Sequence, residues 1–169
     1  LEQRGIITSQ QGKGRFLREI PISQLGEDKQ EEMSKNLERY SLYEAYEVRQ
    51  VLETKAMDLI VRNATDSDLD EIETAYQTML LRFAETNTTT GEFELHQLYA
   101  KKTGSVFMEQ TLNIVLSTIL EMMHTTSHNV MDMHQVEEEK ADHRRIIDAL
   151  HKRDSSAAQQ AMYDHIQHT

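Results

Sequence analysis

Four residues that lie far apart in the sequence have the side chains of a metal centre. Glu92 and His96 are four positions apart, so one helix presents both from the same side. His143 and His165 lie equally far from Asp154, near which the chain must turn between two helices. Residues equidistant from the turn of an antiparallel hairpin lie at the same height, so these two imidazoles should face each other. One carboxylate and three imidazoles that converge suit Zn²⁺, Ni²⁺, Mn²⁺ or Fe²⁺, and four protein ligands leave room for a small anion.

The same residues also have a plainer interpretation. An inward-facing histidine taken singly is more often a hydrogen-bonded core residue than a ligand, so the metal hypothesis needs all four side chains to meet. His124 and His128 are another pair four positions apart, but the Thr and Ser residues between them favour a solvated surface. A di-iron bundle needs two E-x-x-H motifs, and only Glu121 with His124 forms one. The H-E-x-x-H motif of zinc proteases is absent.

Arg49 is a cation on a line of small and apolar residues that includes Ala45 and Leu52. Burying a cation is unfavourable unless it is paired. One hypothesis is therefore a structural ion pair with a carboxylate such as Glu53 or Glu92. The other is that the guanidinium binds the carboxylate of a ligand, for which its planar fork is well shaped.

The elements that must position these residues are almost all helices. Four of the six glycines and the only proline lie within the first 26 residues. Apolar periodicity and capping residues then predict helices near 40–62, from Thr65 to the loop at 86–90, 92–103, 105–127, 132–152, and from Asp154 to the C-terminus. The fourth is apolar on more than one face and is expected to be the most buried. The predicted fold is an all-α antiparallel bundle of about six helices.

The first 18 residues differ from the rest in charge and composition. They carry four basic residues against Glu2, a balance of +3, whereas the whole chain of 169 residues carries −11. The remainder therefore carries −14, which argues against nucleic-acid binding by the helical part. Ile6 and Ile7, the turn-forming residues 10–14, and the segment from Arg15 predict a short β-hairpin with a basic tip. Such a hairpin is marginal alone, and we expect further residues before it.

Composition excludes several classes of protein. The absence of cysteine rules out disulfides and thiolate metal sites and fits a reducing cytoplasm. No apolar run is long enough for a membrane span, and no signal peptide is evident. Three regions are predicted: a hairpin unit at 1–18, a linker at 19–39, and a helical domain at 40–169.

Short segments along the whole chain resemble those of the GntR family of bacterial transcription regulators. Leu1–Ile7 and Gly12–Leu17 resemble the end of the last helix and the wing of its winged helix-turn-helix domain. Residues 43–53 resemble the first helix of the FadR-type (FCD) effector domain. Its metal-binding motifs resemble residues 92–96, His143 and 161–166.

The resemblance implies a ligand-responsive regulator, not an enzyme, whose all-α effector domain is usually dimeric. That domain would hold a divalent metal, Zn²⁺ before Ni²⁺, Mn²⁺ or Fe²⁺, and would bind a small organic acid. The implied metal ligands are Glu92, His96, His143 and His165, with Glu92 in place of the family's usual Asp. Arg49 is the implied contact to the organic acid, and Lys13 and Arg15 belong to the wing remnant that faces operator DNA. The expected protein is a cytoplasmic homodimer without a membrane partner.

Two other functions remain open from the sequence. One is a metal-dependent hydrolase or oxygenase on a helical bundle, although no general base beyond the ligand set is evident. The other is a helical dimerisation module whose histidines are core residues.

Overall fold

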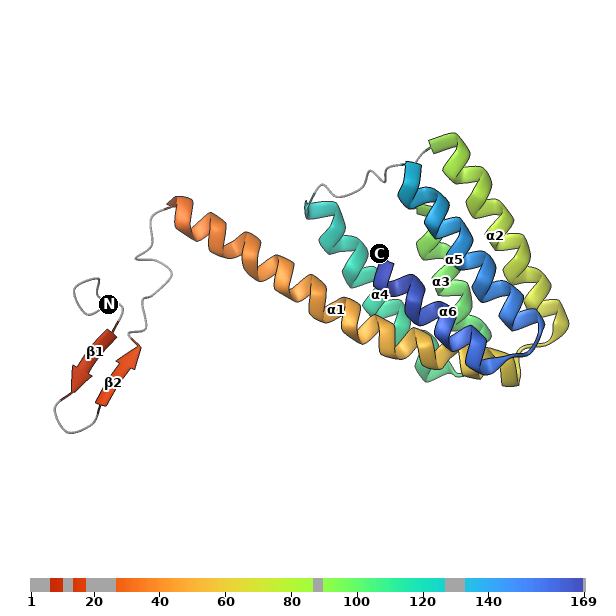
Figure 1. Ribbon diagram of the computed structural model, residues 1–169, viewed down its shortest axis with the longest axis horizontal. Helices are drawn as coiled ribbons and strands as arrows, with labels where there is room; N and C mark the ends of the chain where they lie inside the picture. The colour runs from red at the N-terminus through yellow and green to blue at the C-terminus, as the bar shows by residue number, and fades with distance from the viewer. Residues whose placement is uncertain (1–6, 11–13, 18–26, 87–89, 127–132, 169) are drawn as a thin grey trace. The chain divides into compact units, whose positions relative to one another are not determined.

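The computed structural model describes the backbone of residues 7–10, 14–17, 27–86, 90–126 and 133–168, and the side chains of 41–85, 91–123 and 137–168. The described residues form two strands and six helices (Figure 1). These elements are β1 (Ile7–Gln10), β2 (Gly14–Leu17), α1 (Glu27–Asn63), α2 (Asp66–Thr86), α3 (Thr90–Lys102), α4 (Val106–Thr126), α5 (Met133–His151) and α6 (Ser155–His168). The chain divides into two compact units, Leu1–Ser41 and Leu42–Thr169.

The first unit contains the two short strands. β1 and β2 pair antiparallel, with Ile7 opposite Leu17 and Gln10 opposite Gly14. Lys13 lies outside the described residues, and the side chain of Arg15 is also outside them. The assignment of this segment to a DNA-binding wing therefore stays a prediction.

The second unit is the all-α bundle that the sequence predicts (Figure 1). Within it, α5 packs on α6, α2 packs on both α3 and α5, and α3 packs on α4. The later part of α1 contributes Ala56, Met57 and Ile60 to the shared core, all without exposed surface. All six helices bury apolar side chains in this unit, so no helix of it can shift without opening the core.

The ends of the helices follow the capping residues in the sequence. The Thr65 backbone N–H donates to Asp68 Oδ2 at 2.8 Å, and the Asp68 N–H donates to Thr65 Oγ1 at 3.2 Å, which is a reciprocal capping box. Gly104 ends α3 with φ of +68°, a conformation that suits glycine. Asp154 Oδ1 accepts the Ala157 N–H at 3.0 Å and so caps α6.

The turn between α5 and α6 has a non-glycine residue in the left-handed conformation. Arg153 has φ of 55°, and the Asp154 N–H donates to Ala149 O at 3.0 Å, as in a Schellman motif. The Arg153 guanidinium stabilises this arrangement because it donates to Ala64 O at 2.6 Å and to Asp66 Oδ1 at 2.7 Å. The turn is thus attached to the junction between α1 and α2.

Helix α1 begins earlier than predicted. The expected start was near residue 40, whereas the helix begins at Glu27 and includes part of the predicted linker 19–39. Residues 27–39 are mostly good helix formers and contain neither glycine nor proline. They lack the apolar periodicity of an amphipathic helix, so periodicity did not predict that the helix includes them.

The prediction that the fourth helix is the most buried is wrong. Leu112, Leu116 and Ile119 of α4 are buried, but Phe107 and Ile114 are 81% and 67% exposed. Apolar residues on more than one face of a helix indicate two contact surfaces, and only one of these lies against the bundle.

Replacing Asp154 with Ala should lower the free energy of unfolding by about 1 kcal/mol, because the first turn of α6 loses its cap. Urea unfolding followed by circular dichroism measures this. The control is Asp70→Ala, at an exposed position of α2, which should change stability by less than about 0.5 kcal/mol. Equal effects of the two variants would contradict the capping role.

Candidate metal centre

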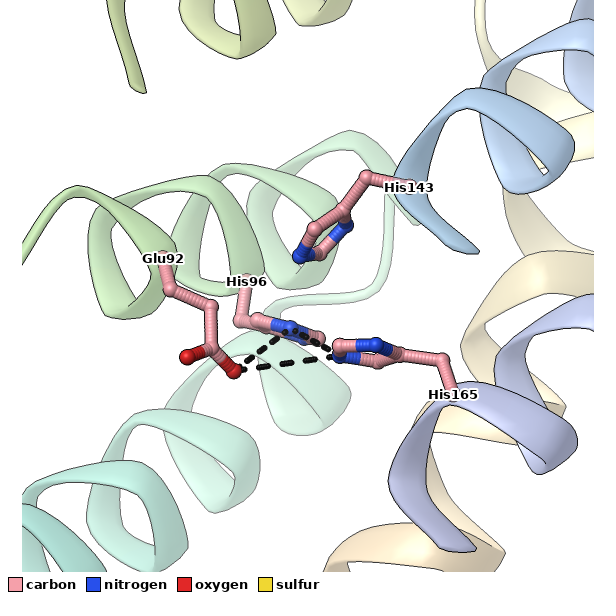
Figure 2. Close-up of side chains that lie close together, drawn as sticks. All are labelled: Glu92, His96, His143 and His165. Carbon is pink, nitrogen blue, oxygen red and sulfur yellow. Dashed lines mark hydrogen bonds and ion pairs between the residues drawn. The ribbon is translucent and has the colours of Figure 1, made fainter. Parts of the chain in front are cut away.

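The four side chains singled out in the sequence meet inside the bundle. Glu92 and His96 come from α3, His143 from α5 and His165 from α6, and they point toward one another (Figure 2). One donor atom from each lies within 4.8 Å of the others. The three histidines have no exposed surface, and Glu92 is 4% exposed. The sequence spacing therefore brings these residues together, while their role as ligands stays a prediction.

The closest approach in this cluster is between two imidazole nitrogens. His96 Nε2 lies 3.1 Å from His165 Nε2, and Glu92 Oε1 lies 3.6 Å and 3.8 Å from these two atoms (Figure 2). Two nitrogens bound to one metal at about 2.0–2.1 Å, with an angle of about 90–110° between the bonds, are about 2.9–3.4 Å apart. The separation of the two nitrogens fits a shared metal ion.

The imidazoles of His143 on α5 and His165 on α6 are neutral. Burial, reinforced by the positive charge that His96 and Arg49 can carry, lowers the pKa of His143 well below its usual value. Burial and the neighbouring histidines have the same effect on the pKa of His165. Neutral imidazole is the form that binds a metal, so these two side chains need not lose a proton first.

Arg49 of α1 lies beside the carboxylate end of the cluster without exposed surface. Its Nε donates to Glu53 Oε1 at 2.7 Å, and one terminal nitrogen donates to Glu92 Oε1 at 3.4 Å. Burial acts to lower the pKa of Arg49, but the two carboxylates outweigh it and the pKa is raised. Of the two hypotheses for this residue, the ion pair is present; the ligand contact stays a prediction.

Glu53 connects the arginine to the histidines. Its Oε2 lies against His96 Nδ1 at hydrogen-bond distance, while its Oε1 accepts from Arg49. Burial would raise the pKa of Glu53, but the adjoining His96 ring and the Arg49 guanidinium lower it to about 2. A carboxylate on Nδ1 fixes the ring so that Nε2 presents its lone pair to the cluster. The sequence analysis named Glu53 only as a partner of Arg49 and missed this contact.

Two further buried carboxyl groups beside the cluster were missed by the sequence analysis. Glu139 and Asp142 of α5 are 4% and 2% exposed. Burial, with the negative charge of Glu92, raises the pKa of Glu139 to about 9. Asp142 accepts from Arg145 and lies 2.8 Å from His168 Nδ1. The available signal was spacing, because Glu139 precedes His143 by four positions as Glu92 precedes His96.

Several buried polar atoms around the cluster have no hydrogen-bond partner among the described residues. They include both ring nitrogens of His143, Nδ1 of His165 and one terminal nitrogen of Arg49. Buried polar groups are nearly always paired, so such atoms indicate a group that belongs there. A divalent cation fits this donor set: it would accept imidazole lone pairs and balance buried carboxylates. An anion on the cation would give the free arginine nitrogen an acceptor.

The rival histidine pair is not tested by the structure. The side chains of His124 and His128 lie outside the described residues. In the described part of the chain, no helix is both long enough and apolar enough to cross a membrane.

Comparison with known proteins defines the class of this chain. Residues 44–168 match the model of the FCD domain, so the chain belongs to the FCD domain family. Over 171 residues it is 24% identical to the HTH-type transcriptional regulator LutR of Bacillus subtilis strain 168, covering 98% of this chain and 76% of that protein. The protein is a GntR-family transcription regulator of the FCD type and not an enzyme, which removes the hydrolase or oxygenase alternative.

Solved structures share the fold. Streptococcus agalactiae GntR aligns with a TM-score of 0.66 at 20% identity, covering 99% of this chain and 75% of that one. E. coli McbR/YncC aligns with a TM-score of 0.62 at 14% identity, covering 99% of this chain and 76% of that one. The chain therefore shares its fold with these two proteins.

Replacing Arg49 with Leu should destabilise the metal-free protein by about 3–5 kcal/mol, because Glu53 and Glu92 would stay buried without their partner. Urea unfolding in the presence of EDTA measures this. The matched control is Arg62→Leu, which removes an exposed ion pair with Asp58 and should cost at most about 1 kcal/mol. If the two variants were equally stable, the buried ion pair would not be a structural requirement.

Proposed function

We propose that the helical domain senses a small organic acid through a bound divalent metal, and that this event controls DNA binding by the intact regulator. Glu92, His96, His143 and His165 hold the metal, and no chemistry is performed on the acid. Zn²⁺ is the first choice because nitrogen and carboxylate ligands suit it, with Ni²⁺, Mn²⁺ and Fe²⁺ as alternatives.

The observation that carries this proposal is the contact between His96 Nε2 and His165 Nε2, 3.1 Å apart and fully buried. When Nδ1 of His96 donates to Glu53, Nε2 has only a lone pair to present. Two such lone pairs facing each other repel unless a cation or a proton lies between them. The pKa of His165 is lowered, so its ring is neutral and carries a single N–H. When that N–H lies on Nδ1, Nε2 presents a second lone pair, and a cation would join the two nitrogens.

Arg49 supports the organic acid as the effector. One of its terminal nitrogens is buried without a hydrogen-bond partner among the described residues, and the other reaches Glu92. Tyr46 and Phe93 lie 5.4 Å and 5.7 Å from the guanidinium carbon, so the group is held between aromatic rings. A carboxylate that bound the metal would also accept a charge-assisted hydrogen bond from this nitrogen.

The N-terminal unit belongs to the DNA-binding part in this proposal. Residues 1–18 are the end of a winged helix-turn-helix domain, and Lys13 and Arg15 contact phosphates of the operator beside the reading helix of the intact regulator. The local charge of +3 suits that role, and the charge of −14 on the remainder keeps the helical domain away from DNA.

The purified wild-type chain should bind one equivalent of Zn²⁺, and His143→Ala and His165→Ala should each weaken binding at least tenfold, because each removes a ligand. Isothermal titration with zinc chloride, with metal content by mass spectrometry, measures both. Saturating zinc at about 100 times the dissociation constant should stabilise the wild type by about 2.7 kcal/mol.

The control for these variants is His151→Ala, an exposed histidine of α5 outside the cluster. A wild type that holds no more zinc than His143→Ala would contradict the assignment, and the histidines would then be core residues. A second titration tests the acid: acetate, malonate and citrate are added to zinc-loaded and zinc-free wild type. Saturable binding that requires zinc supports the sensor, and binding by neither form contradicts it.

The proposed regulator is a homodimer in which α4 contributes to the contact. Phe107 and Ile114 are seven positions apart on one exposed face of α4, with Val106 beside them. The exposed positions of α4 between 106 and 118 carry no charge. In an acidic domain, an uncharged apolar face is the surface on which two copies meet with the least repulsion.

Changing Phe107 and Ile114 together to Glu should convert the dimer into a monomer, because four added carboxylates would then face one another across the contact. Sedimentation velocity measures the change. Leu81→Glu is the control, since Leu81 of α2 is 66% exposed and lies on another helix. A double variant that remains dimeric would show that this face is not the interface.

A further inference from the structure

Glu139 of α5 is a buried carboxyl group that the proposed ligand set does not use. It lies one turn before His143 and is 4% exposed. It is not among the residues whose donor atoms cluster within 4.8 Å. Its Oε2 has no hydrogen-bond partner among the described residues. A side chain of this kind needs a partner that is close by and equally unpaired.

Such a partner is present on α6. Glu139 Oε2 lies 3.4 Å from His165 Nδ1, which is also buried without a hydrogen bond among the described residues. The other nitrogen of that ring, Nε2, faces His96 and Glu92. Glu139 therefore lies on the Nδ1 side of the His165 ring, and the same oxygen is farther, 3.8 Å, from His143 Nε2.

The same arrangement exists already for another histidine of the cluster. Glu53 lies against Nδ1 of His96, and Nε2 of that ring faces inward. A metal-bound histidine commonly donates its outer N–H to a carboxylate, which fixes the tautomer and the plane of the ring. Glu53 and Glu139 thus occupy equivalent places on two rings whose inner nitrogens are 3.1 Å apart.

Among the described residues, the only other carboxylate near His165 Nδ1 is that of Asp142, and it is less suited to the role. Asp142 Oδ2 is 3.9 Å from His165 Nδ1, farther than Glu139. Both of its oxygens have other partners, since Oδ1 accepts from Arg145 and Oδ2 lies 2.8 Å from His168 Nδ1. Glu139 Oε2 has no such competing hydrogen bond among the described residues.

We infer that Glu139 is a positioning residue of the metal centre: it accepts the N–H of His165 Nδ1 and so presents the Nε2 lone pair of that ring to the metal. The inference rests on the proposed metal-binding function and assigns a role to a residue outside the ligand set. The 3.4 Å separation is slightly longer than a hydrogen bond of about 2.9 Å. Metal binding at Nε2 makes the Nδ1–H a stronger donor and closes this contact.

The test compares two substitutions that differ in one property. Glu139→Leu removes the acceptor and should weaken zinc binding about 10–100-fold. Glu139→Gln keeps an oxygen acceptor and should recover most of that affinity. Titration of each chain with zinc chloride gives the dissociation constants, and the matched controls Glu137→Leu and Glu137→Gln change an exposed residue of the same helix.

Two further measurements separate positioning from a structural role. The melting temperature of the zinc-free Glu139→Leu chain should not fall, because the substitution removes a buried carboxyl group whose Oε2 has no hydrogen-bond partner among the described residues. Nitrogen NMR of the zinc-loaded wild type should show His165 protonated at Nδ1, and the leucine variant should lose that single tautomer.

The outcomes distinguish the inference from the function on which it rests. Weaker zinc binding by Glu139→Leu, without a fall in the melting temperature of the zinc-free chain, supports the inference. Zinc binding equal to that of Glu137→Leu overturns it and leaves the metal site standing. The inference is also overturned if the zinc-free Glu139→Leu chain melts at a lower temperature, this loss of stability accounts for its weaker zinc binding, and Glu139→Gln binds zinc no more tightly than Glu139→Leu. A wild type that binds no zinc overturns the proposed function and the inference together.

Discussion

The buried guanidinium of Arg49 is the interaction on which the centre of this bundle depends. It binds Glu53 on its own helix and Glu92 on α3, and Glu53 in turn lies against His96. One positive charge thus permits two carboxylates to be buried, and one of these orients an imidazole. These contacts join α1 to α3. The positions of the side chains in the centre therefore depend on how α1 packs.

The opposite side of the centre depends on the hairpin of α5 and α6. Its turn is held by the left-handed Arg153 and the cap at Asp154, and the Arg153 side chain ties it to the end of α1. A displacement of one residue in this turn would rotate His143 and His165 away from each other, since successive helical residues point about 100° apart. The short connection therefore determines how His143 and His165 face each other.

The centre also shows how a helical bundle can carry polar groups in its interior. Tyr99, a buried residue of the main core, lies edge-on to the His96 ring with the ring centroids 5.6 Å apart, so the cluster adjoins the apolar core. This environment keeps the imidazoles of His143 and His165 neutral and makes unpaired polar atoms unfavourable. The domain therefore combines two features of a ligand-binding site: a preformed donor set, and buried atoms such as those of Arg49 and His143 that lack partners within the described chain.

Local signals in the sequence were enough for most of the helices, for their caps, and for the pairs Glu92–His96 and His143–His165. That the two pairs meet was decided by the packing of the helices. Spacing of four within a helix and symmetry about a turn are properties of backbone geometry, and they hold without knowledge of the packing. Periodicity did not predict the start of α1 at Glu27, because residues 27–39 form a polar helix without an apolar face. It also overestimated the burial of α4, because the sequence pattern does not distinguish an apolar residue in the core from one that remains exposed.

Only the tertiary structure decided which partner each polar group meets. The sequence left two hypotheses for the partner of Arg49, a carboxylate of the chain or a bound ligand. In the structure it pairs with Glu53 on its own helix and with Glu92 on α3. In the sequence, Glu139 is one of several acidic residues of its helix and has no distinguishing feature. In the structure, α6 places His165 within 3.4 Å of it. The physical reason is that the sequence determines the charge and hydrogen-bonding capacity of each side chain. The energies of the interactions depend on burial and distance, which arise from contacts between helices far apart in the chain.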